Sequence, residues 1–156
     1  MEENRFIVSC QNGDYTAFGQ LYDIYIRKIY DFLYFRTLHK QTAEDLTSTV
    51  FTKALEKIKQ FDAKKAKFST WLYQIAKNTL IDHFRTLRQT NDIQGIWDMP
   101  SDIDIERDAD TVLLLEKVRT HIKELPALQR DIVIMRLWDG LPYREIAEVL
   151  NISEVS

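Results

Sequence analysis

The sequence predicts an all-α protein made of two small helical domains joined by a flexible acidic linker. The chain of 156 residues has only four Gly and three Pro, too few for the turns of a hairpin-rich sandwich or barrel. Its apolar residues recur at steps of three and four, which is the spacing of one helix face. The length allows one ordinary domain or two small ones and excludes the large doubly wound and barrel enzymes.

The first predicted helix is short and covers residues 4–11. Asn12 and Gly13 are expected to end it, and Asp14 is placed to cap the next helix by accepting hydrogen bonds from its first free amides. That second helix runs to about Leu38. Its apolar positions form one stripe that must be buried, namely Phe18, Leu21, Tyr22, Tyr25, Ile29, Phe32 and Leu33.

A third helix is predicted from Thr42 to about Lys59. Thr42 and Asp45 resemble a capping box with Asp in place of the usual Glu or Gln. The segment QFDAKKAK, residues 60–67, then loses the helical period. A fourth helix to about Arg88 restores it through Phe68, Trp71, Leu72, Ile75, Ala76, Thr79, Leu80 and Phe84. Residues 1–90 therefore form a first domain, a bundle of three or four helices.

The linker is predicted at residues 91–110, which hold seven acidic residues, one basic residue, Gly95 and Pro100. Such a segment has no helical apolar period and is typical of a solvated connection. The acidic residues of the linker also offset, in the net charge of the whole chain, a local excess of positive charge in the first domain. The net charge of the chain is −3, yet residues 53–88 contain nine Lys or Arg and three acidic residues. This density suggests a polyanionic partner, although lysines on a solvated helix face are the plainer interpretation.

The second domain is predicted at residues 111–156. Its first helix ends at Leu125, because the residue before Pro126 is biased out of helical geometry, and residues 127–138 form the next helix. In DGLPYREIAEVLNIS, Gly140 and Asn151 are placed at turns, as in a helix-turn-helix; an ordinary helical hairpin is the alternative. The second helix of that motif lies in the DNA major groove. Residues 153–156 supply at most one turn of it, so we expect the recognition helix to be truncated.

Cysteine and histidine give no sign of a metal or disulfide site. Cys10 is the single cysteine, and His39, His83 and His121 lie too far apart in sequence for a short-spacing metal motif. No stretch has the apolar length of a membrane span, and the N-terminus is not a secretory signal. We expect a reduced cytoplasmic protein that needs no cofactor.

Taken together, four segments resemble the extracytoplasmic-function sigma factors of bacterial RNA polymerase, in the family's order and over almost the whole chain. The segments are FGQLYDIYIRKIYDFLY, AEDLTSTVFTKAL, FSTWLYQIAKNTLIDHFR and LPALQRDIVIMRLWDGLPYREIAEVLNIS. The resemblance implies a non-catalytic subunit that directs promoter recognition, DNA opening and transcription initiation. Its partners would be polymerase core, promoter DNA and an anti-sigma factor.

For the first domain, the resemblance implies two binding surfaces. The AEDL segment would dock on polymerase core through Glu44 and Asp45, which also suit the helix N-terminus because acids favour its dipole. Ser48 and Thr49 stand where the family usually carries a Gln-Glu pair. The fourth helix and residues 60–67 would capture the single-stranded minus-ten element, where cations track the backbone and bases stack or pair. The implied DNA-binding residues are Lys64, Lys65, Lys67, Lys77, Asn78, Asp82, Arg85 and Arg88. For Phe68, Trp71 and Leu72 a place in the core is the preferred interpretation.

The second domain would read the minus-thirty-five duplex if its C-terminus were complete. Arg144 and Glu145, expected to be exposed, are candidates for backbone contact, and Arg130 and Arg136 are weaker ones. Two other functions stay open at this point. One is a stand-alone helix-turn-helix regulator. The other is a helical hydrolase using carboxylates such as Glu44 and Asp45, although the sequence indicates no further residues of a catalytic pocket.

Overall fold

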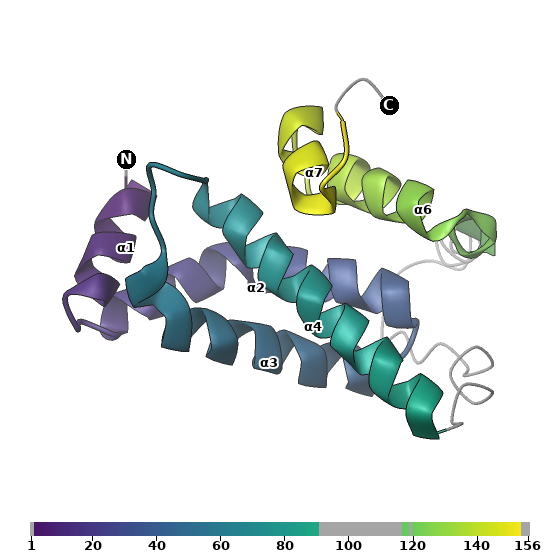
Figure 1. The fold of residues 1–156 in the computed structure, drawn as a ribbon, viewed down its shortest axis with the longest axis horizontal. Coiled ribbons are helices and arrows are strands. Elements are labelled where there is room, and N and C mark those ends of the chain that lie inside the picture. Colours follow the sequence, from purple (N-terminus) through teal and green to yellow (C-terminus); the bar gives the residue numbers. More distant parts are fainter. Residues whose placement is uncertain (1, 91–116, 119, 154–156) are drawn as a thin grey trace, which may run out of the picture.

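The structure, a computed structural model, describes residues 2–90, 117–118 and 120–153. All regular structure in these residues is helical, as the sequence predicts (Figure 1). The α-helices are α1 (Glu2–Gln11), α2 (Thr16–Thr37), α3 (Lys40–Lys57), α4 (Phe68–Thr90), α6 (Ala127–Val133) and α7 (Tyr143–Leu150). A 3₁₀ turn, η1 (Ile58–Gln60), follows α3, and a π-helical turn, η3 (Ile134–Trp138), follows α6. The predicted linker, residues 91–110, lies outside the described residues.

The turn between α1 and α2 forms as the sequence predicts. Gly13 has a φ of 98°, a left-handed conformation that glycine adopts without a steric cost. Asp14 then accepts a hydrogen bond from the backbone N–H of Thr16 at 3.1 Å. The first free amide of α2 is therefore satisfied by a side chain, although Asp14 lies one residue before the N-cap, Tyr15, whose own side chain makes no capping hydrogen bond.

The start of α3 differs from the prediction. The helix begins at Lys40, and the residue that caps it is His39, whose Nδ1 accepts a hydrogen bond from the backbone N–H of Thr42 at 3.2 Å. The predicted capping box is wrong because Thr42 and Asp45 already lie inside the helix. The preceding residue, Leu38, ends α2 in a left-handed conformation with a φ of 54°. This tight reversal brings α3 back alongside α2.

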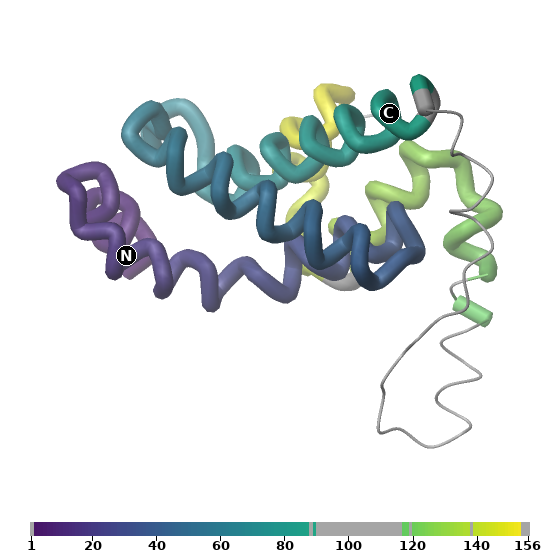
Figure 2. The backbone as a smooth tube through the Cα atoms, turned by 90° about the horizontal axis from the view of Figure 1, so that it is seen from below, coloured from purple at the N-terminus to yellow at the C-terminus, as the bar shows by residue number. Residues whose placement is uncertain are grey.

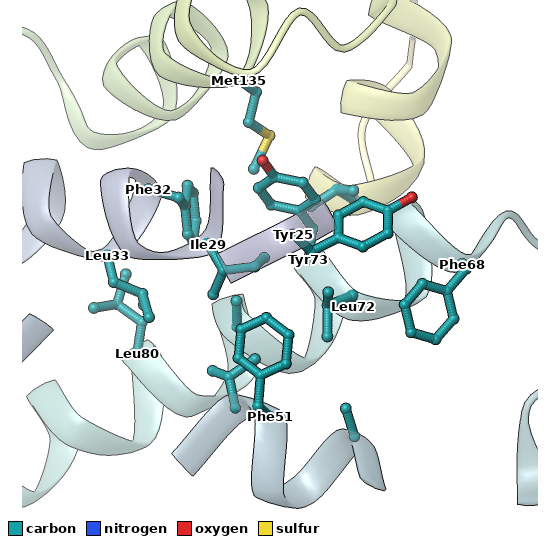
Figure 3. Close-up of a cluster of buried hydrophobic side chains, with 14 of the residues drawn as sticks. Tyr25, Ile29, Phe32, Leu33, Phe51, Phe68, Leu72, Tyr73, Leu80 and Met135 are labelled. Atoms are coloured by element: carbon teal, nitrogen blue, oxygen red, sulfur yellow. The ribbon is translucent and has the colours of Figure 1, made fainter. Parts of the chain in front are cut away.

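The core of the first module lies between α2, α3 and α4 (Figure 3). The stripes predicted on these helices face one another, and the side chains of Ile29, Phe32 and Leu72 have no exposed surface. Tyr22, predicted to be buried in the α2 stripe, is instead 40% exposed. Phe68 is 2% exposed, so the preference for a core position is confirmed for Phe68 and Leu72. Trp71 is partly buried and packs against this core.

The second module consists of α6, η3 and α7, preceded by helical residues at 120–124. Its two turns use the residues singled out in the sequence: Gly140 has a φ of 68° and Asn151 a φ of 55°. The last residues of the predicted helix-turn-helix, 154–156, lie outside the described part of the chain. The expectation about a truncated recognition helix therefore rests on sequence alone.

The two modules pack against each other. Helix α7 lies against α4, and η3 lies against α2 (Figures 1 and 2). Met135 of the second module is fully buried and extends toward Tyr25 and Tyr73 of the first (Figure 3). The apolar cluster therefore continues from one module into the other. In the described part of the chain, no helix has the length and apolar character needed to cross a membrane.

Candidate nucleic-acid interface

The loop before α4 is a short structured turn that presents lysines. Asp62 accepts hydrogen bonds from the backbone N–H of Lys64, through its side chain at 2.9 Å, and of Lys65, through its carbonyl at 3.0 Å. The start of the loop is tied to α1, because Gln11 donates to the carbonyl of Phe61 at 2.8 Å. The backbone is thus held while the side chains of both lysines are exposed.

Three aromatic rings pack together where this loop joins α4. Phe61, Phe68 and Trp71 pack together with ring centroids 5.1 to 5.6 Å apart. Such offset and edge-to-face contacts stabilise a cluster beyond its buried area. Phe61 and Phe68 are buried and therefore fix the path of the loop into α4. Trp71, which is partly buried, is the ring of the three that retains a solvent-facing part.

The C-terminal half of α4 presents an exposed polar face. Asn78, Asp82 and Arg85 are all exposed there. Asp82 forms an ion pair with Arg85 on the same helix, so part of the charge of Arg85 is already balanced. Arg88 belongs to α4, but its side chain lies outside the described residues.

Two further predicted DNA-binding lysines are engaged by the second module. Lys67 forms an ion pair with Glu145 of α7, and Ser69 donates to the same carboxylate at 3.2 Å. Lys77 donates to the carbonyl of Val149 at 3.3 Å. The structure therefore divides the predicted cations into an outward group and a group bonded to the other module.

This contact corrects an expectation about Glu145. The sequence suggested an exposed residue able to approach the DNA backbone, but Glu145 is 7% exposed and faces α4. Arg130 is corrected as well: it is 6% exposed and donates to the carbonyls of Ile122, Lys123 and Leu125. It therefore holds the start of the second module together. Arg136 donates to the carbonyl of Leu141 at 3.2 Å and lies 5.0 Å from the ring centroid of Tyr143.

Arg144 is the predicted DNA-binding residue of the second module that is most open to solvent. Its side chain is 82% exposed and lies 3.7 Å from Glu148, one turn along α7. An exposed pair of this kind contributes little to stability. Its guanidinium is therefore free to leave Glu148 for another anion.

The predicted polymerase-binding residues lie together on the outer surface of α3. Glu44, Asp45, Ser48 and Thr49 are all exposed. Glu44 and Ser48 also line a groove of about 620 Å³ between α2 and α3, whose walls include Tyr22, Tyr30 and Phe51. The groove combines aromatic walls with one carboxylate, Glu44, and one guanidinium, Arg27. Its walls suit an apolar side chain, and Glu44 suits a cation beside it.

Two carboxylates lie buried where the modules meet. Burial raises the pKa of Asp139 to about 7, while the Tyr73 hydroxyl and Lys28 oppose the rise. Burial also raises the pKa of Asp131 to about 6, against the effects of Arg36, Arg130 and Lys77. Asp131 lies 3.0 Å from Nε of Arg36 on α2. Sequence reasoning missed this cluster, because nothing in the spacing of these residues indicates that they meet.

Comparison with known proteins agrees with both modules. The family model for sigma-70 region 2 matches residues 21–90, and the model for sigma-70 region 4 matches residues 115–156. The RNA polymerase sigma factor SigW of Bacillus subtilis, an extracytoplasmic-function member, is 33% identical over 94% of this chain and 83% of its own length. The chain belongs to the extracytoplasmic-function sigma factor family.

Other relatives agree with this assignment. The extracytoplasmic-function sigma factor BldN of Streptomyces coelicolor is 34% identical over 92% of the chain, which spans only 56% of that relative. Among solved structures, CnrH in complex with the cytosolic domain of CnrY superimposes with a TM-score of 0.75 over 99% of this chain and 86% of the other, at 20% identity. That likeness supports the fold.

Membership of this family gives the function of the chain. A sigma factor binds RNA polymerase core and directs promoter recognition and transcription initiation, and DNA and polymerase are its partners. The sigma factor interpretation of the sequence is thereby confirmed, in preference to the stand-alone regulator. The two family matches leave the roles of individual residues to be argued from the geometry.

Proposed function

We propose that residues 1–90 of this sigma factor hold polymerase core on one side and capture the opened minus-ten strand on the other. The observation that supports the proposal is the outward display of charge and hydrogen-bonding groups by the loop and α4. Lys64, Lys65 and Arg85 are exposed beside Asn78. Cations that follow a phosphate backbone next to a side chain able to reach a base edge suit a single strand.

The polymerase surface is α3 with its groove. Glu44 and Asp45 supply negative charge, and the small side chains of Ser48 and Thr52 leave room between them and Tyr22 for a partner side chain. Where the family usually carries a Gln-Glu pair, Ser48 and Thr49 offer fewer polar contacts. The groove then becomes the apolar part of the interface, with Glu44 meeting a cation of the polymerase at its edge.

The second module carries the duplex contact through Arg144. Residues 111–156 thus form the upstream half of the promoter-binding surface, and the acidic residues 91–110 connect it to the first half. The chain acts in the cytoplasm, beside the polymerase that it serves, and catalyses no reaction of its own. An anti-sigma factor is a further partner, since the CnrH structure that shares this fold is a complex with the cytosolic domain of CnrY.

The direct test of the function is run-off transcription with core polymerase over a promoter library. This chain and a C-terminally extended version are compared. Promoter-specific transcripts that depend on the added chain are expected. A chain that leaves transcription by core polymerase unchanged on every promoter would contradict the proposal.

The polymerase surface is tested by charge reversal in a pull-down with core polymerase. Glu44→Arg places a cation at the edge of the groove and is expected to weaken core binding roughly tenfold or more, because like charges then meet. Glu56→Arg is the matched control, since Glu56 is also exposed on α3 but lies outside the groove. Equal binding by the two variants would show that the groove is not the docking surface.

A further inference from the structure

Helix α1 braces the start of the lysine-bearing loop, residues 60–67. It packs against α2 and against η1, the turn that leads from α3 into the loop (Figure 1). Ile7 and Cys10 anchor α1 in the apolar core, and Tyr25 of α2 donates a hydrogen bond to Glu3 at 3.0 Å. The helix is therefore held on the bundle near both of its ends, and a side chain at its last residue has a defined position.

Gln11, the last residue of α1, bonds to both sides of η1. Its side-chain Nε2 donates to the carbonyl of Ile58 at 3.0 Å and to the carbonyl of Phe61 at 2.8 Å. A glutamine amide nitrogen carries two N–H donors, so these bonds use both of them. Ile58 begins η1 and Phe61 directly follows it. One side chain therefore ties the turn after α3 to the loop.

The two carbonyls need a partner from outside α3. The last carbonyls of a helix have no partner within it, and a buried backbone group without a hydrogen bond is costly. Ile58 and Phe61 are both buried, so water is a poor substitute for Gln11. The ring of Phe61 is held by Phe68 and Trp71, and its carbonyl is held by Gln11. Both parts of Phe61 are thus fixed just before the lysines.

The hydrogen bonds inside the loop set its shape but not its position on the bundle. Asp62 accepts from the backbone N–H groups of Lys64 and Lys65, and these bonds move with the loop. Its position is set where the chain joins the bundle, at Phe61 on one side and at Phe68, the first residue of α4, on the other. Loss of the bond at the first of these joints would let the lysines shift.

We propose that Gln11 is a positioning residue for single-strand capture: its side-chain amide holds the loop so that Lys64 and Lys65 meet the phosphates of the melted minus-ten strand. The inference rests on the proposed role of the loop in DNA capture and adds a residue that touches no DNA itself. A loop that is ordered before binding loses little conformational freedom when the strand arrives, and binding is tighter for that reason. The contact lies wholly within the first module.

The test removes the donors of Gln11 and keeps its size. Gln11→Met is uncharged, and Gln11→Glu has nearly the same shape but turns an acceptor toward the two carbonyls. Holoenzyme with each variant is titrated with labelled oligothymidine, a probe of the phosphate contacts, and fluorescence anisotropy is read at several salt concentrations. Both variants are expected to bind about threefold or more weakly at low salt. The slope of log affinity against log salt should fall by about 0.7 for each lysine that loses its phosphate.

Three further variants and two measurements separate positioning from general damage. Gln20→Met and Gln20→Glu are matched controls, since they make the same chemical changes at an exposed glutamine of α2. Gln11→Lys restores N–H donors, because a lysine ammonium carries three, and is expected to keep the wild-type slope. Circular dichroism and a pull-down with core polymerase show that each variant is folded and bound. A merely structural loss would lower the fraction of active chain and leave the slope unchanged.

A double-mutant cycle tests whether Gln11 acts through the lysines of the loop. The variant Lys64→Ala/Lys65→Ala removes both cations. Adding Gln11→Met to it should then cost little further affinity for oligothymidine, because the loop has no lysine left to position. Independent effects would instead give additive losses.

The proposal is overturned if a folded Gln11→Met or Gln11→Glu holoenzyme binds oligothymidine with the affinity and salt slope of its Gln20 control. Additive losses in the cycle, or a slope for Gln11→Lys as low as that for Gln11→Met, would equally contradict it. Promoter-dependent transcription by the wild-type holoenzyme separates the two levels of inference. If that transcription is present while the Gln11 variants bind normally, the sigma function stands and the positioning role fails. If wild-type holoenzyme binds oligothymidine no better than core polymerase alone, capture by the loop fails, and the role of Gln11 fails with it.

Discussion

At the scale of single residues, His39 caps the start of α3, although histidine is uncommon at helix starts. Its Nδ1 accepts the N–H of Thr42 and lies 2.7 Å from the Thr42 hydroxyl. The first amides of a helix lack partners within the helix, and a side chain that satisfies one of them stabilises the helix. The position matters because α3 carries Glu44 and Asp45 within its first two turns.

We therefore predict that His39→Ala lowers the free energy of unfolding by about 1 kcal/mol, the usual cost of losing a helix cap. His121→Ala is the control, because the side chain of His121 is 77% exposed on a helix of the second module. Urea unfolding followed by circular dichroism measures both. A loss for His39→Ala no greater than that for His121→Ala would mean that the ring contributes nothing as a cap.

The same residues mark what a sequence can predict about a helix start. Asp14 and Gly13 were predictable because their side chain and backbone preferences act locally. Thr42 and Asp45 carry the local pattern of a capping box, yet the helix starts two residues earlier. The left-handed turn at Leu38 is imposed by the packing of α3 on α2, and a leucine gives no local signal of such a turn.

At the scale of elements, α4 has three faces with three different uses. One face is the core stripe of Phe68, Leu72 and Leu80, which the helical period predicted because apolar residues must be buried. A second face, with Ser69, Tyr73 and Lys77, contacts the second module. The third is the solvent-facing side with Asn78 and Arg85. In the sequence, the polar residues of the last two faces look alike. Only the structure distinguishes the face that contacts the second module from the face that is exposed to solvent.

The solvent-facing side leads to a prediction about salt dependence. In the holoenzyme, Lys64→Ala and Arg85→Ala are each expected to make the binding of a single-stranded minus-ten oligonucleotide less sensitive to salt. The slope of log affinity against log salt should fall by about 0.7 for each phosphate that no longer meets a cation. Lys57→Ala, at an exposed position at the end of α3, should leave the slope unchanged. Equal slopes for all three variants would show that Lys64 and Arg85 do not contact the DNA backbone.

At the scale of the whole molecule, the sequence predicted two helical modules but not their packing. The contacts between them join residues that are more than 70 positions apart, such as Lys67 with Glu145. No periodicity relates such positions, and charged residues usually face solvent. The buried Asp139 could not be foreseen either, because Gly140 beside it indicates an ordinary turn. The packing of the modules adds a pair of carboxyl groups, Asp131 and Asp139, that are costly to ionise in the folded chain.

This cluster makes the stability of the folded chain sensitive to pH. Asp139 faces Tyr73 of α4 and Asp31 and Lys28 of α2, and its pKa is raised to about 7. A carboxyl group whose pKa is higher in the folded protein than in the unfolded chain binds more protons when folded, so the stability it contributes is lost as the pH rises through the folded pKa. Asp131, with a pKa of about 6, acts in the same direction at slightly lower pH.

We predict that the free energy of unfolding falls by about 1 to 3 kcal/mol between about pH 5.5 and about pH 8, since each group changes it by at most about 1.4 kcal/mol per pH unit. Asp139→Asn keeps the shape of a neutral carboxyl group and should remove most of the fall above about pH 6. Histidines also titrate in this range, so the informative quantity is the difference from Asp23→Asn, a substitution at an exposed position of α2.

Urea unfolding at each pH measures the slope. The fall levels off above about pH 7, where Asp139 is ionised in the folded chain as well as in the unfolded one. A pH slope in Asp139→Asn as steep as that of Asp23→Asn would show that this carboxyl group keeps its charge in the folded chain, and Asp139 would then add nothing to the pH dependence of stability.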